Sequence, residues 1–451
     1  MNPLVSAGPW PSDAETRHQR SDSNAALRFL VAAAAGSAWF GLSLWLALPW
    51  IDELGGIVGP ALAWFLIFGV ALAPGFMNAF VVASLLMIPS VSRNEPQHLP
   101  PLTILIAAYN EAANIGATLR SIAAQRYRGA FEVIVIDDGS TDDTAKMTAT
   151  GGYPWMRLLA QPANRGKAAA LNRGLAEARH ELIVTLDADS CLHPDALRLL
   201  VMEYASGTND MRAVAGAVFV SNPHASWITR LQHWDYFNGI AAIKRVQGSY
   251  GGTLVAQGAF SLYERSALRE IGGWPACVGE DIVVTWAIIK RGGRVGYAPD
   301  AACFTRVPET LRGLSHQRIR WGRGMIEAFR YHPDILVMRR LSAFMASWNL
   351  LFPCIDFAFT FGFIPGLVLA LFGKYWLVGP ATLAVIPSAI LMGAVMQRLS
   401  AQVFTALDLQ IRRDAIGFMG YTLGYNLILQ PSSLRGYFAE VLGLPKTWGT
   451  K

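Results

Sequence analysis

The sequence predicts an α/β domain that is built on a mostly parallel sheet and flanked by transmembrane α-helices. Composition is the first observation, because only 16% of the 451 residues are charged, whereas an average soluble domain carries about 25%. The second observation is that this deficit is local, which favours membrane spans over an unusually apolar globular protein. The third is that residues 100–335 have soluble composition and alternate strand and helix patterns, as chains with parallel sheets do.

The N-terminal part is expected to contain a disordered segment and two membrane spans. Residues 1–24 are polar and show no apolar period, so they are predicted to be disordered. Residues 25–90 are predicted to hold two transmembrane helices, because the stretches 29–50 and 55–89 carry no charge and are long enough to cross a bilayer. The acidic pair Asp52-Glu53 is assigned to the loop between them.

Basic residues flank these two spans on one side only. Arg17, Arg20 and Arg28 precede the first span, Arg93 follows the second, and the intervening loop has no Lys or Arg. The positive-inside rule then places the N-terminus and the domain after Pro89 in the cytoplasm. The predicted localisation is therefore a multi-pass membrane protein with a cytosolic central domain.

The central domain, residues 100–335, is predicted from its alternating patterns. The helix after the second strand is expected to begin at Ser140-Thr141, because hydroxyl side chains cap helix N-termini. About 230 residues are enough for one sizeable core. The predicted strands are 103–109, 131–137, 156–160 and 181–187, and the other predicted helices are 113–125, 167–178 and 194–204.

The chain turns apolar again after Arg339-Arg340. Residues 341–430 are predicted to form about three transmembrane or interfacial helices, and 431–451 are expected to be a tail. The segment 407–413 is amphipathic enough to lie along the membrane surface. The three candidate C-terminal spans are 341–373, 375–396 and 415–429.

Charge and cysteine content exclude some classes of protein. The net charge of +6 is explained by membrane topology and anionic lipid, and no basic cluster or motif predicts nucleic-acid binding. The cysteines form no CxxC pair, so neither a zinc site nor a disulfide framework is expected. The four thiols are Cys191, Cys277, Cys303 and Cys354.

Polar residues follow the first two predicted strands. Tyr109-Asn110-Glu111 follows one and Asp138 follows the next, and ligands of open α/β sheets bind at such strand ends. Asp138 there can accept a hydrogen bond from a nucleotide base or ribose. The alternative is a turn and helix cap, which explains Gly139 and Ser140 but not two consecutive acids.

Lys167 opens the next predicted helix after Asn164-Arg165-Gly166. A lysine at a helix N-terminus favours a phosphate or a uracil carbonyl. The segment lacks the Gly-x4-Gly-Lys-Ser/Thr pattern, so it is not an ATPase phosphate loop. A solvated surface lysine is the alternative.

Asp187 and Asp189 leave the strand 181–187 two residues apart. Carboxylates so placed can converge on one divalent ion, Mg²⁺ or Mn²⁺, that bridges a diphosphate. Such an ion neutralises charge on a leaving nucleoside diphosphate. An Asp-x-Asp in an ordinary loop is the alternative.

Glu280 and Asp281 open a helical pattern after Gly279. Asp281 is our candidate general base, which would take a proton from an attacking hydroxyl, with Glu280 as the substitute. The competing interpretation is ordinary acid placement at a helix N-terminus.

The run Gln317-Arg318-Ile319-Arg320-Trp321 lies on an amphipathic segment just before the second apolar region. An arginine can hold a diphosphate with two parallel hydrogen bonds, and an indole face can stack on a sugar ring. A basic juxtamembrane helix with an interfacial Trp is the alternative, but it does not account for Gln317.

In this order, the motifs resemble the processive membrane glycosyltransferases of family 2, which include cellulose, chitin, hyaluronan and poly-N-acetylglucosamine synthases. The resemblance covers about residues 100–335 and the flanking spans, and it is greatest to bacterial poly-β-1,6-N-acetylglucosamine synthases. It implies a nucleotide-binding, Rossmann-like GT-A fold and inversion at the anomeric carbon. The stretches that carry it are NRGKAAALNRGLAEAR, HPDALRLL, AAIKRVQGSYGG and VPETLRGLSHQRIRWGRGMIEAF.

The resemblance also implies roles by position. The donor side is expected to comprise Tyr109, Glu111, Asp138, Lys167, Asp187 and Arg320, with Asp189 on the metal. Asp281 would be the base, and Gln317, Trp321 and Glu280 would contact the acceptor. Arg318 fits the variable second place of its motif. The chain departs from the usual pattern at Gly279, where Thr-Glu-Asp is usual, and it lacks the large C-terminal regulatory domain of cellulose synthases.

The function that the sequence predicts is a UDP-sugar-dependent, inverting hexosyltransferase of the bacterial inner membrane. It would polymerise N-acetylglucosamine from its UDP donor into an exopolysaccharide of the kind found in biofilms, coupled to export. Its expected partners are the donor, the growing polysaccharide, the lipid bilayer and a small accessory membrane subunit, and no nucleic acid. The alternatives are a hyaluronan-, chitin- or glucan-type synthase, a non-processive transferase acting on a lipid-linked acceptor, and a non-catalytic scaffold.

Overall fold

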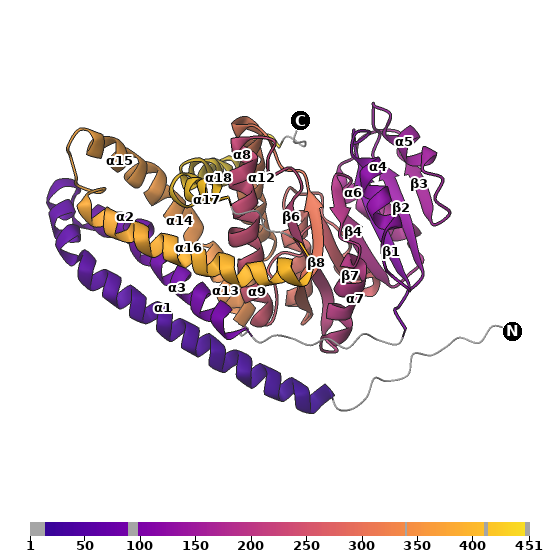
Figure 1. Ribbon diagram of the computed structural model, residues 1–451, viewed down its shortest axis with the longest axis horizontal. Helices are drawn as coiled ribbons and strands as arrows, with labels where there is room; N and C mark the ends of the chain where they lie inside the picture. The colour runs from indigo at the N-terminus through magenta and orange to yellow at the C-terminus, as the bar shows by residue number, and fades with distance from the viewer. Residues whose placement is uncertain (1–13, 89–97, 339–340, 410–413, 447–451) are drawn as a thin grey trace.

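The computed structural model describes residues 14–88, 98–338, 341–409 and 414–446. A sheet domain lies at one end of the molecule and long apolar helices lie at the other (Figure 1). The sheet has eight strands in the order β3-β2-β1-β4-β7-β6-β8-β5. Their bounds are β1 Leu102–Ala108, β2 Phe131–Asp137, β3 Met156–Ala160, β4 Leu182–Leu186, β5 Ser190–Leu192, β6 Met211–Val220, β7 Phe260–Glu264 and β8 Arg294–Thr305.

The sheet confirms the predicted fold class. Strands β1, β2, β3 and β4 are parallel, and so are β6 and β8. Strand β7 runs antiparallel between β4 and β6, and β5 pairs antiparallel with β8. The four predicted strands correspond to β1 to β4, whereas the last four strands were not predicted.

Helices cover both faces of this sheet, because its strands are apolar on both sides. The domain helices are α4 Ile115–Ala123, α5 Thr144–Thr150, α6 Lys167–Glu177, α7 Ala196–Ser206, α8 Trp227–Trp234, α9 Ala242–Ser249, α10 Arg265–Ile271, α11 Glu280–Lys290 and α12 Leu311–Tyr331. In β1, Ile104 and Ile106 pack in the core under α4 and α7, whereas Leu105 packs in the core that contains α6 and α11. Alternate side chains of one strand point to opposite faces, so one strand contributes to both cores.

The start of α5 corrects one prediction. The helix begins at Thr144 with Asp143 at the N-cap, and not at Ser140-Thr141. The hydroxyl of Ser140 instead accepts from the backbone N–H of Asn110, and the Thr144 N–H donates to Asp142. Ser140 thereby joins the ends of β1 and β2.

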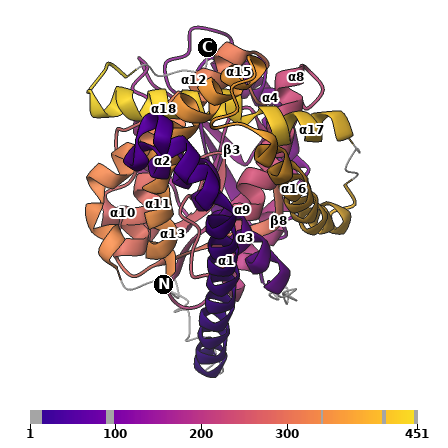
Figure 2. The same cartoon turned by 90° about the vertical axis from the view of Figure 1, so that its left-hand side faces the viewer.

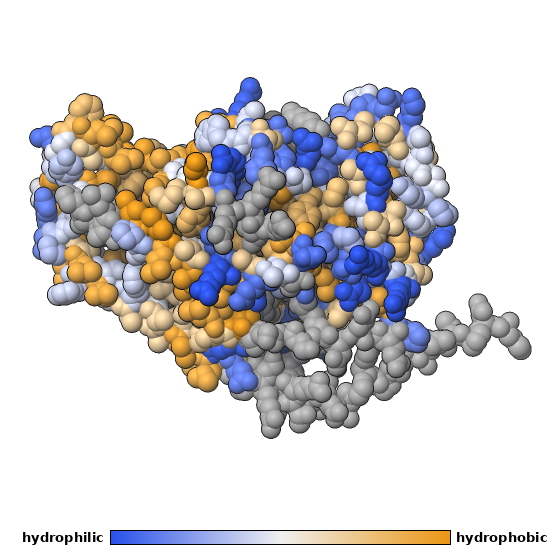
Figure 3. Space-filling view, viewed as in Figure 1, coloured by the Kyte–Doolittle hydropathy of each residue, from blue (hydrophilic) through white to orange (hydrophobic). Residues whose placement is uncertain are grey.

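Within the part of the chain that the structure describes, three helical stretches are long and apolar enough to cross a membrane, namely Asn24–Val58, Pro60–Met87 and Ala343–Leu371. Apolar side chains gather over this end of the molecule (Figure 3). The helices there are α1 Ala14–Val58, α2 Pro60–Ile67, η1 Phe68–Leu72, α3 Ala73–Met87, α13 Leu341–Asn349, α14 Leu351–Ala358, η4 Phe359–Phe363, α15 Ile364–Leu371, α16 Pro380–Ala406, α17 Ala415–Gly424 and α18 Asn426–Val441.

Several expectations for these ends need correction. Helix α1 begins at Ala14, within the segment predicted to be disordered, and residues 1–13 lie outside the described residues. The pair Asp52-Glu53 lies within α1, which continues to Val58, because nothing before Gly59-Pro60 interrupts the helix. The predicted tail begins inside α18, which continues to Val441.

The other membrane predictions are only partly covered by the structure. The spans predicted at 375–396 and 415–429 correspond to α16 and α17, and neither is among the three stretches above. The segment predicted to lie along the membrane surface, 407–413, falls mostly outside the described residues. The number of spans therefore stays a prediction.

The apolar helices pack directly on the sheet domain. The Tyr250 ring, just after α9, contacts Phe29 of α1 and Phe80 of α3, and its hydroxyl donates to Ser84 of α3 at 2.8 Å. Helix α12 lies against α18, where the Arg323 guanidinium donates to Glu440. Figure 2 shows α10, α11 and α13 on one side of α1 and α3, with α16 and α17 on the other. The sheet domain and the apolar helices thus share one core.

Candidate active site

The parallel strands β1, β2 and β4 end at one edge of the sheet, and the predicted site begins there. Asn110 adopts a φ of 57°, a left-handed conformation that asparagine tolerates. Its side-chain oxygen accepts from the Thr141 N–H at 2.9 Å. Tyr109 is exposed, and the Glu111 carboxylate accepts from Asn114 at 2.7 Å. These contacts fix the loops after β1 and β2 against each other.

Asp138 is buried and holds the loop that leads into α6. Its two carboxylate oxygens accept from the backbone N–H groups of Arg165 and Gly166, at 2.9 and 2.8 Å. Burial raises its pKa, and these two hydrogen bonds oppose the rise. Gly139 is required next to it, because a Cβ there would lie 2.6 Å from the Ala163 backbone. Asp138 thereby helps to set the position of Lys167, which directly follows Gly166.

Lys167 is the central cation of the site. Its Nζ lies 2.5 Å from Asp187 Oδ1 and 4.0 Å from Glu280 Oε1. Burial alone would lower the pKa of Lys167, but the neighbouring acids, above all the close carboxylate of Asp187, outweigh burial and raise it. Lys167 is therefore charged, and it joins the end of β4 to the start of α11.

Asp189 lies at the acidic end of the same cluster. Burial raises its pKa to about 6, and the negative charges of Asp187 and Glu111 add to the rise. The Thr305 hydroxyl, at the end of β8, donates to Asp189 Oδ1 at 3.3 Å. Three acids from two strand ends thus concentrate negative charge in one place.

Glu280 and Asp281 form the first turn of α11, beside the loop before β7. The backbone N–H of Gly258 donates to Asp281 Oδ2 at 3.4 Å. A Cβ on Gly258 would lie 2.7 Å from Lys167 Nζ, so the glycine lets the tip of this lysine approach the loop closely. This close approach brings Asp281, Lys167 and Glu280 together.

Two observations on Glu280 point in different directions. Lys167 Nζ lies 4.0 Å from Glu280 Oε1, and this positive charge favours the ionised form of Glu280. Burial and the neighbouring Asp281 instead raise the pKa of Glu280 to about 8. The effect of burial on Glu280 is the larger one, because Glu280 is only 7% exposed and Lys167 already has a much closer partner in Asp187. Glu280 is therefore protonated at neutral pH.

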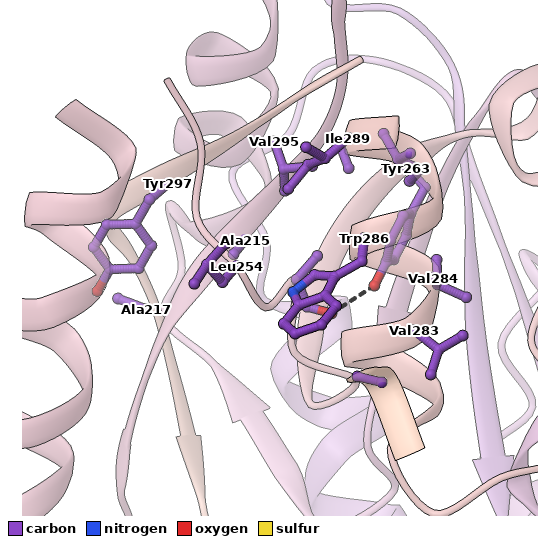
Figure 4. Close-up of a cluster of buried hydrophobic side chains, with 14 of the residues drawn as sticks. Ala215, Ala217, Leu254, Tyr263, Val283, Val284, Trp286, Ile289, Val295 and Tyr297 are labelled. Carbon is purple, nitrogen blue, oxygen red and sulfur yellow. Dashed lines mark hydrogen bonds between the residues drawn. The ribbon is translucent and has the colours of Figure 1, made fainter. Parts of the chain in front are cut away.

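Helix α11 is held in place by an apolar cluster behind its acids (Figure 4). Val283, Val284 and Trp286 of α11 pack with Tyr263 of β7. The Tyr263 hydroxyl donates to the Ala256 carbonyl at 2.7 Å, which fixes the loop that carries Gly258. Burying a side chain of this size contributes about 1.5–3 kcal/mol, so α11 is a rigid support.

A buried lysine lies behind the loop as well. Lys244 of α9 donates from its Nζ to the Val255 carbonyl. Burial lowers its pKa to about 7, and the charge of Asp281 opposes this fall. A buried lysine that holds its proton less tightly than an exposed one thus lies within the electrostatic field of Asp281.

Helix α12 brings the Gln-Arg-x-Arg-Trp motif to the site. Burial lowers the pKa of Arg320, and the acids of the site, Asp187 among them, oppose this fall. Gln317 is buried, and it forms a hydrogen bond to the Tyr236 hydroxyl that lowers the pKa of Tyr236, which burial raises to about 12. The Oε1 of Gln317 and the Nε of Arg320 are buried without a partner among the described residues. Unpaired buried polar atoms are costly, and a ligand would satisfy them.

Trp321 is partly exposed and rests on Arg318. The Arg318 guanidinium lies 4.0 Å from the centre of the Trp321 ring. Arg318 also pairs with the buried Asp235 at 2.6 Å and donates to the Tyr425 hydroxyl at 2.9 Å. The Tyr236 ring lies 6.3 Å from the Trp321 ring. Trp321 therefore lies on a surface built by α12, the π-helix η2 Asp235–Ala241 and the segment before α18.

The structure brings most of the predicted residues together. Lys167, Asp187, Glu280, Asp281 and Arg320 form one charged cluster, with Asp189 and Glu111 at its edge. Asp138 is connected to it through the loop 165–167, whereas Gln317 and Trp321 lie beside Tyr236.

Residues that the sequence analysis missed include Tyr236, Gly258, Thr305 and the Asp235–Arg318 pair. The partners are far apart in sequence, 83 residues for Asp235 and Arg318. Spacing along the chain cannot reveal such pairs. Gly258 had a weak signal, because it interrupts an apolar run just before a strand.

Asp187 and Asp189 fit a divalent cation. Like charges raise the pKa of Asp189, and a bound cation would relieve that repulsion. No group of three or more His, Cys, Asp or Glu that could hold a metal occurs within residues 14–88, 98–338, 341–409 and 414–446. Two carboxylates are nevertheless a common protein contribution to Mg²⁺, whose other ligands are phosphate oxygens and water.

Comparison with known proteins matches the same part of the chain. Residues 100–324 match the family model described as glycosyltransferase like family 2. The chain is 36% identical over 231 residues to a poly-beta-1,6-N-acetyl-D-glucosamine synthase of Staphylococcus aureus, covering 50% of this chain and 55% of that protein. It is 33% identical over 238 residues to the synthase of the same name from Staphylococcus epidermidis, covering 51% and 56%. The matched region thus spans about half the length of these curated relatives.

A solved structure confirms the fold. It is a mannosyltransferase from Pyrobaculum calidifontis in complex with GDP-mannose and Mn²⁺. The TM-score is 0.59 at 21% identity, covering 85% of this chain and 99% of that one. The likeness supports the predicted Rossmann-like α/β fold of the sheet domain.

Proposed function

Because the chain carries a glycosyltransferase family 2 domain, we propose that it is an inverting enzyme that polymerises N-acetylglucosamine from UDP-N-acetylglucosamine. The curated relatives are named for a polymer of that sugar. Residues 100–324, which match the family model, contain every proposed site residue. The observation that carries the proposal is the cluster of Lys167, Asp187 and Asp281 at one sheet edge, with Arg320 facing it.

The donor would lie along the ends of β1, β2 and β4. Asp138, with the loop after β1 at Tyr109 and Glu111, would border the uridine, because both follow parallel strands that end at the same edge. Lys167 and Arg320 would hold the diphosphate, since they are the cations within the acidic cluster. Asp187 and Asp189 would hold Mg²⁺ or Mn²⁺, which neutralises diphosphate charge when bound. The similar mannosyltransferase was solved with a nucleotide sugar and Mn²⁺.

The acceptor would approach from α12. Trp321 offers a partly exposed indole face, and Gln317 has a buried oxygen without a partner among the described residues. Asp281 would take the proton from the acceptor hydroxyl as that oxygen attacks the anomeric carbon, opposite the nucleotide. Glu280, protonated at neutral pH, would donate a hydrogen bond to the acceptor and leave Asp281 as the base. Lys167 and Arg320 would stabilise charge on the departing diphosphate.

The molecule around the site supports a membrane setting. The three apolar helical stretches would hold the sheet domain beside the bilayer, and the basic residues before the first span favour a cytosolic domain. Synthesis coupled to export across the bilayer, and a small accessory subunit, complete the proposal. A polymer that stays on the donor side of sealed vesicles would rule out the coupling.

The test is a donor panel on the full chain in membranes. UDP-N-acetylglucosamine, UDP-glucose, UDP-glucuronate and GDP-mannose are supplied in turn, and nucleotide release and product length are measured. We expect long polymer from UDP-N-acetylglucosamine only. A single added sugar would favour the non-processive alternative, and a different productive donor would overturn the assigned substrate.

The variant Asp281→Asn tests the proposed general base. We expect nucleotide binding to remain and transfer to fall by about 10²–10⁴-fold, the usual contribution of a general base. Undiminished transfer would remove Asp281 from the mechanism and favour the scaffold alternative.

A further inference from the structure

The start of α11 meets α12 in a backbone-to-backbone contact. A Cβ on Gly279 would lie 2.5 Å from the Gly324 carbonyl oxygen, and a Cβ on Gly324 would lie 2.8 Å from the Gly279 Cα. Side chains are therefore excluded on both sides of this crossing. Gly279 directly precedes Glu280 and Asp281, so the position of α12 sets the position of both acids.

One turn after Gly324, Glu327 fastens this crossing. Its Oε2 accepts from the backbone N–H of Gly279 at 2.9 Å. Glu327 is only 2% exposed, so its charge needs a nearby cation. That cation is Lys446, whose Nζ pairs with Glu327 Oε1.

Lys446 belongs to a segment that follows α18, and this segment is itself anchored to α12. The Arg323 guanidinium donates to the carbonyl oxygens of Leu444 and Pro445, the latter at 2.9 Å. Its Nε donates to Glu440 of α18 at 3.2 Å. Glu440 also pairs with Lys446 at 3.3 Å and with Arg330 at 3.0 Å. We name residues Leu444–Lys446 the strap.

We propose that the strap completes the active site, with Glu327 and Lys446 acting as positioning residues for the first turn of α11. Lys446 neutralises Glu327, Glu327 holds the Gly279 N–H, and Gly279 sets the direction in which Glu280 and Asp281 leave the loop. The carboxylates of Glu327 and Glu440 are buried and hydrogen-bonded, whereas the Lys446 side chain is 40% exposed. The buried acids therefore set the direction of these contacts, and Lys446 reaches them from the surface. The strap thereby couples α18, among the apolar helices, to the acids of the sheet domain.

Arg330 provides a matched control within the same ion cluster. It pairs with Glu440 but reaches neither Glu327 nor Gly279 in any interaction described above, and half of its side chain is exposed. Lys446→Met and Arg330→Met each remove one positive charge near Glu440. Only Lys446→Met removes the partner of Glu327.

The experiment compares amide hydrogen exchange in the full chain, purified in detergent, for wild type, Lys446→Met, Lys446→Arg and Arg330→Met. We expect residues 277–283 to exchange about tenfold or more faster in Lys446→Met, because opening of the Gly279 hydrogen bond controls local exchange. Lys446→Arg, which keeps the charge, and Arg330→Met should match wild type. Equal exchange in Lys446→Met and Arg330→Met would overturn the proposal.

A kinetic comparison tests the link to catalysis, which rests on the proposed role of Asp281. In Lys446→Met we expect the turnover number to fall while the donor KM is unchanged, and Lys446→Arg should restore turnover. A raised donor KM with unchanged turnover would contradict positioning of the acids. If wild type transfers no sugar from the donor panel, the proposed function fails, but the exchange comparison still decides whether the strap holds α11.

Discussion

At the scale of single residues, the site depends on two adjacent acids that carry different charges. Glu280 is buried and next to Asp281, and these two effects raise its pKa to about 8. When two neighbouring carboxyl groups lie in different environments, their pKa values differ. The group with the higher pKa can then donate a proton, while the other acts as a base. The same pattern here separates the proposed role of Glu280 from that of Asp281.

Glu280→Gln is therefore expected to preserve transfer at pH 7, because the amide imitates the protonated acid. In wild type, transfer should fall as pH rises through about 8, since ionised Glu280 then repels Asp281. The variant should lack this loss. The free energy of unfolding of wild type should fall as pH rises from 4.5 to about 8, because over this range the folded state keeps a proton that the unfolded state has released. Rates measured from pH 6 to 9 test this, and identical profiles would contradict it.

The departure from the usual Thr-Glu-Asp motif is explained by space. Gly279 has a φ of −99°, which any residue can adopt, so backbone conformation does not require glycine. Glycine is required at position 279 because the Gly324 backbone lies too close for a Cβ.

We expect Gly279→Thr, which restores the usual motif, to lower transfer. Moving the acids by about 1 Å costs on the order of 100-fold in rate, and overpacking costs about 1–3 kcal/mol of stability. Turnover and the apparent unfolding temperature in detergent measure both. Gly272→Ala is unsuitable as a control because of its φ of 86°, whereas Gly41→Ala, in open space within α1, should be neutral. Full activity of Gly279→Thr would show that α12 can move away.

At the scale of elements, α12 is the helix on which the site depends most. Arg320 lies near the acids and Gln317 contacts Tyr236. Arg318 and Arg323 instead pair with acids of other helices. The second place of the Gln-Arg-x-Arg-Trp motif was assigned only as variable from the sequence. The structure gives Arg318 a buried partner, Asp235, and places it under Trp321.

Arg318→Lys should weaken acceptor use and leave donor binding unchanged. Lysine keeps a charge for Asp235 but loses the flat surface on which the Trp321 ring lies. We expect shorter products and a several-fold higher acceptor KM, measured with defined oligosaccharides. Arg312→Lys, an exposed position on the same helix, is the control. Unchanged product length in Arg318→Lys would remove Arg318 from acceptor positioning.

At the scale of the whole molecule, the apolar helices form part of the domain's core. Phe80 of α3 is fully buried, and its ring contacts Tyr250 beside α9 and Trp348 of α13. Spans from both ends of the chain therefore meet at one place on the sheet domain.

Phe80→Ala is expected to destabilise the whole chain by about 3–5 kcal/mol, because it leaves a cavity where three elements meet. The apparent unfolding temperature in detergent should fall, with the donor KM unchanged. Trp45→Ala is the control, since Trp45 is 68% exposed on α1 and is expected to face lipid. Equal effects of the two variants would mean that the spans do not stabilise the domain.

Local patterns in the sequence were sufficient for several features. Apolar, β-branched runs identified β1 to β4, because alternation and length distinguish strands, and uncharged stretches identified the first two apolar helices. The strand end at Asp187 and the helix starts at Lys167 and Asp281 also indicated charged residues of a site, and these three residues lie close together.

Only the tertiary structure decided which distant residues meet. Strands β5 to β8 are paired through crossovers, and no local period encodes that order. Asp235 under Arg318, Gly324 against Gly279, and Lys446 on Glu327 are contacts between residues 45 to 119 positions apart. Sequence fixes chemistry and local geometry, whereas partners across the fold depend on packing of the whole chain. That physical difference explains why the acids were found and their supports were not.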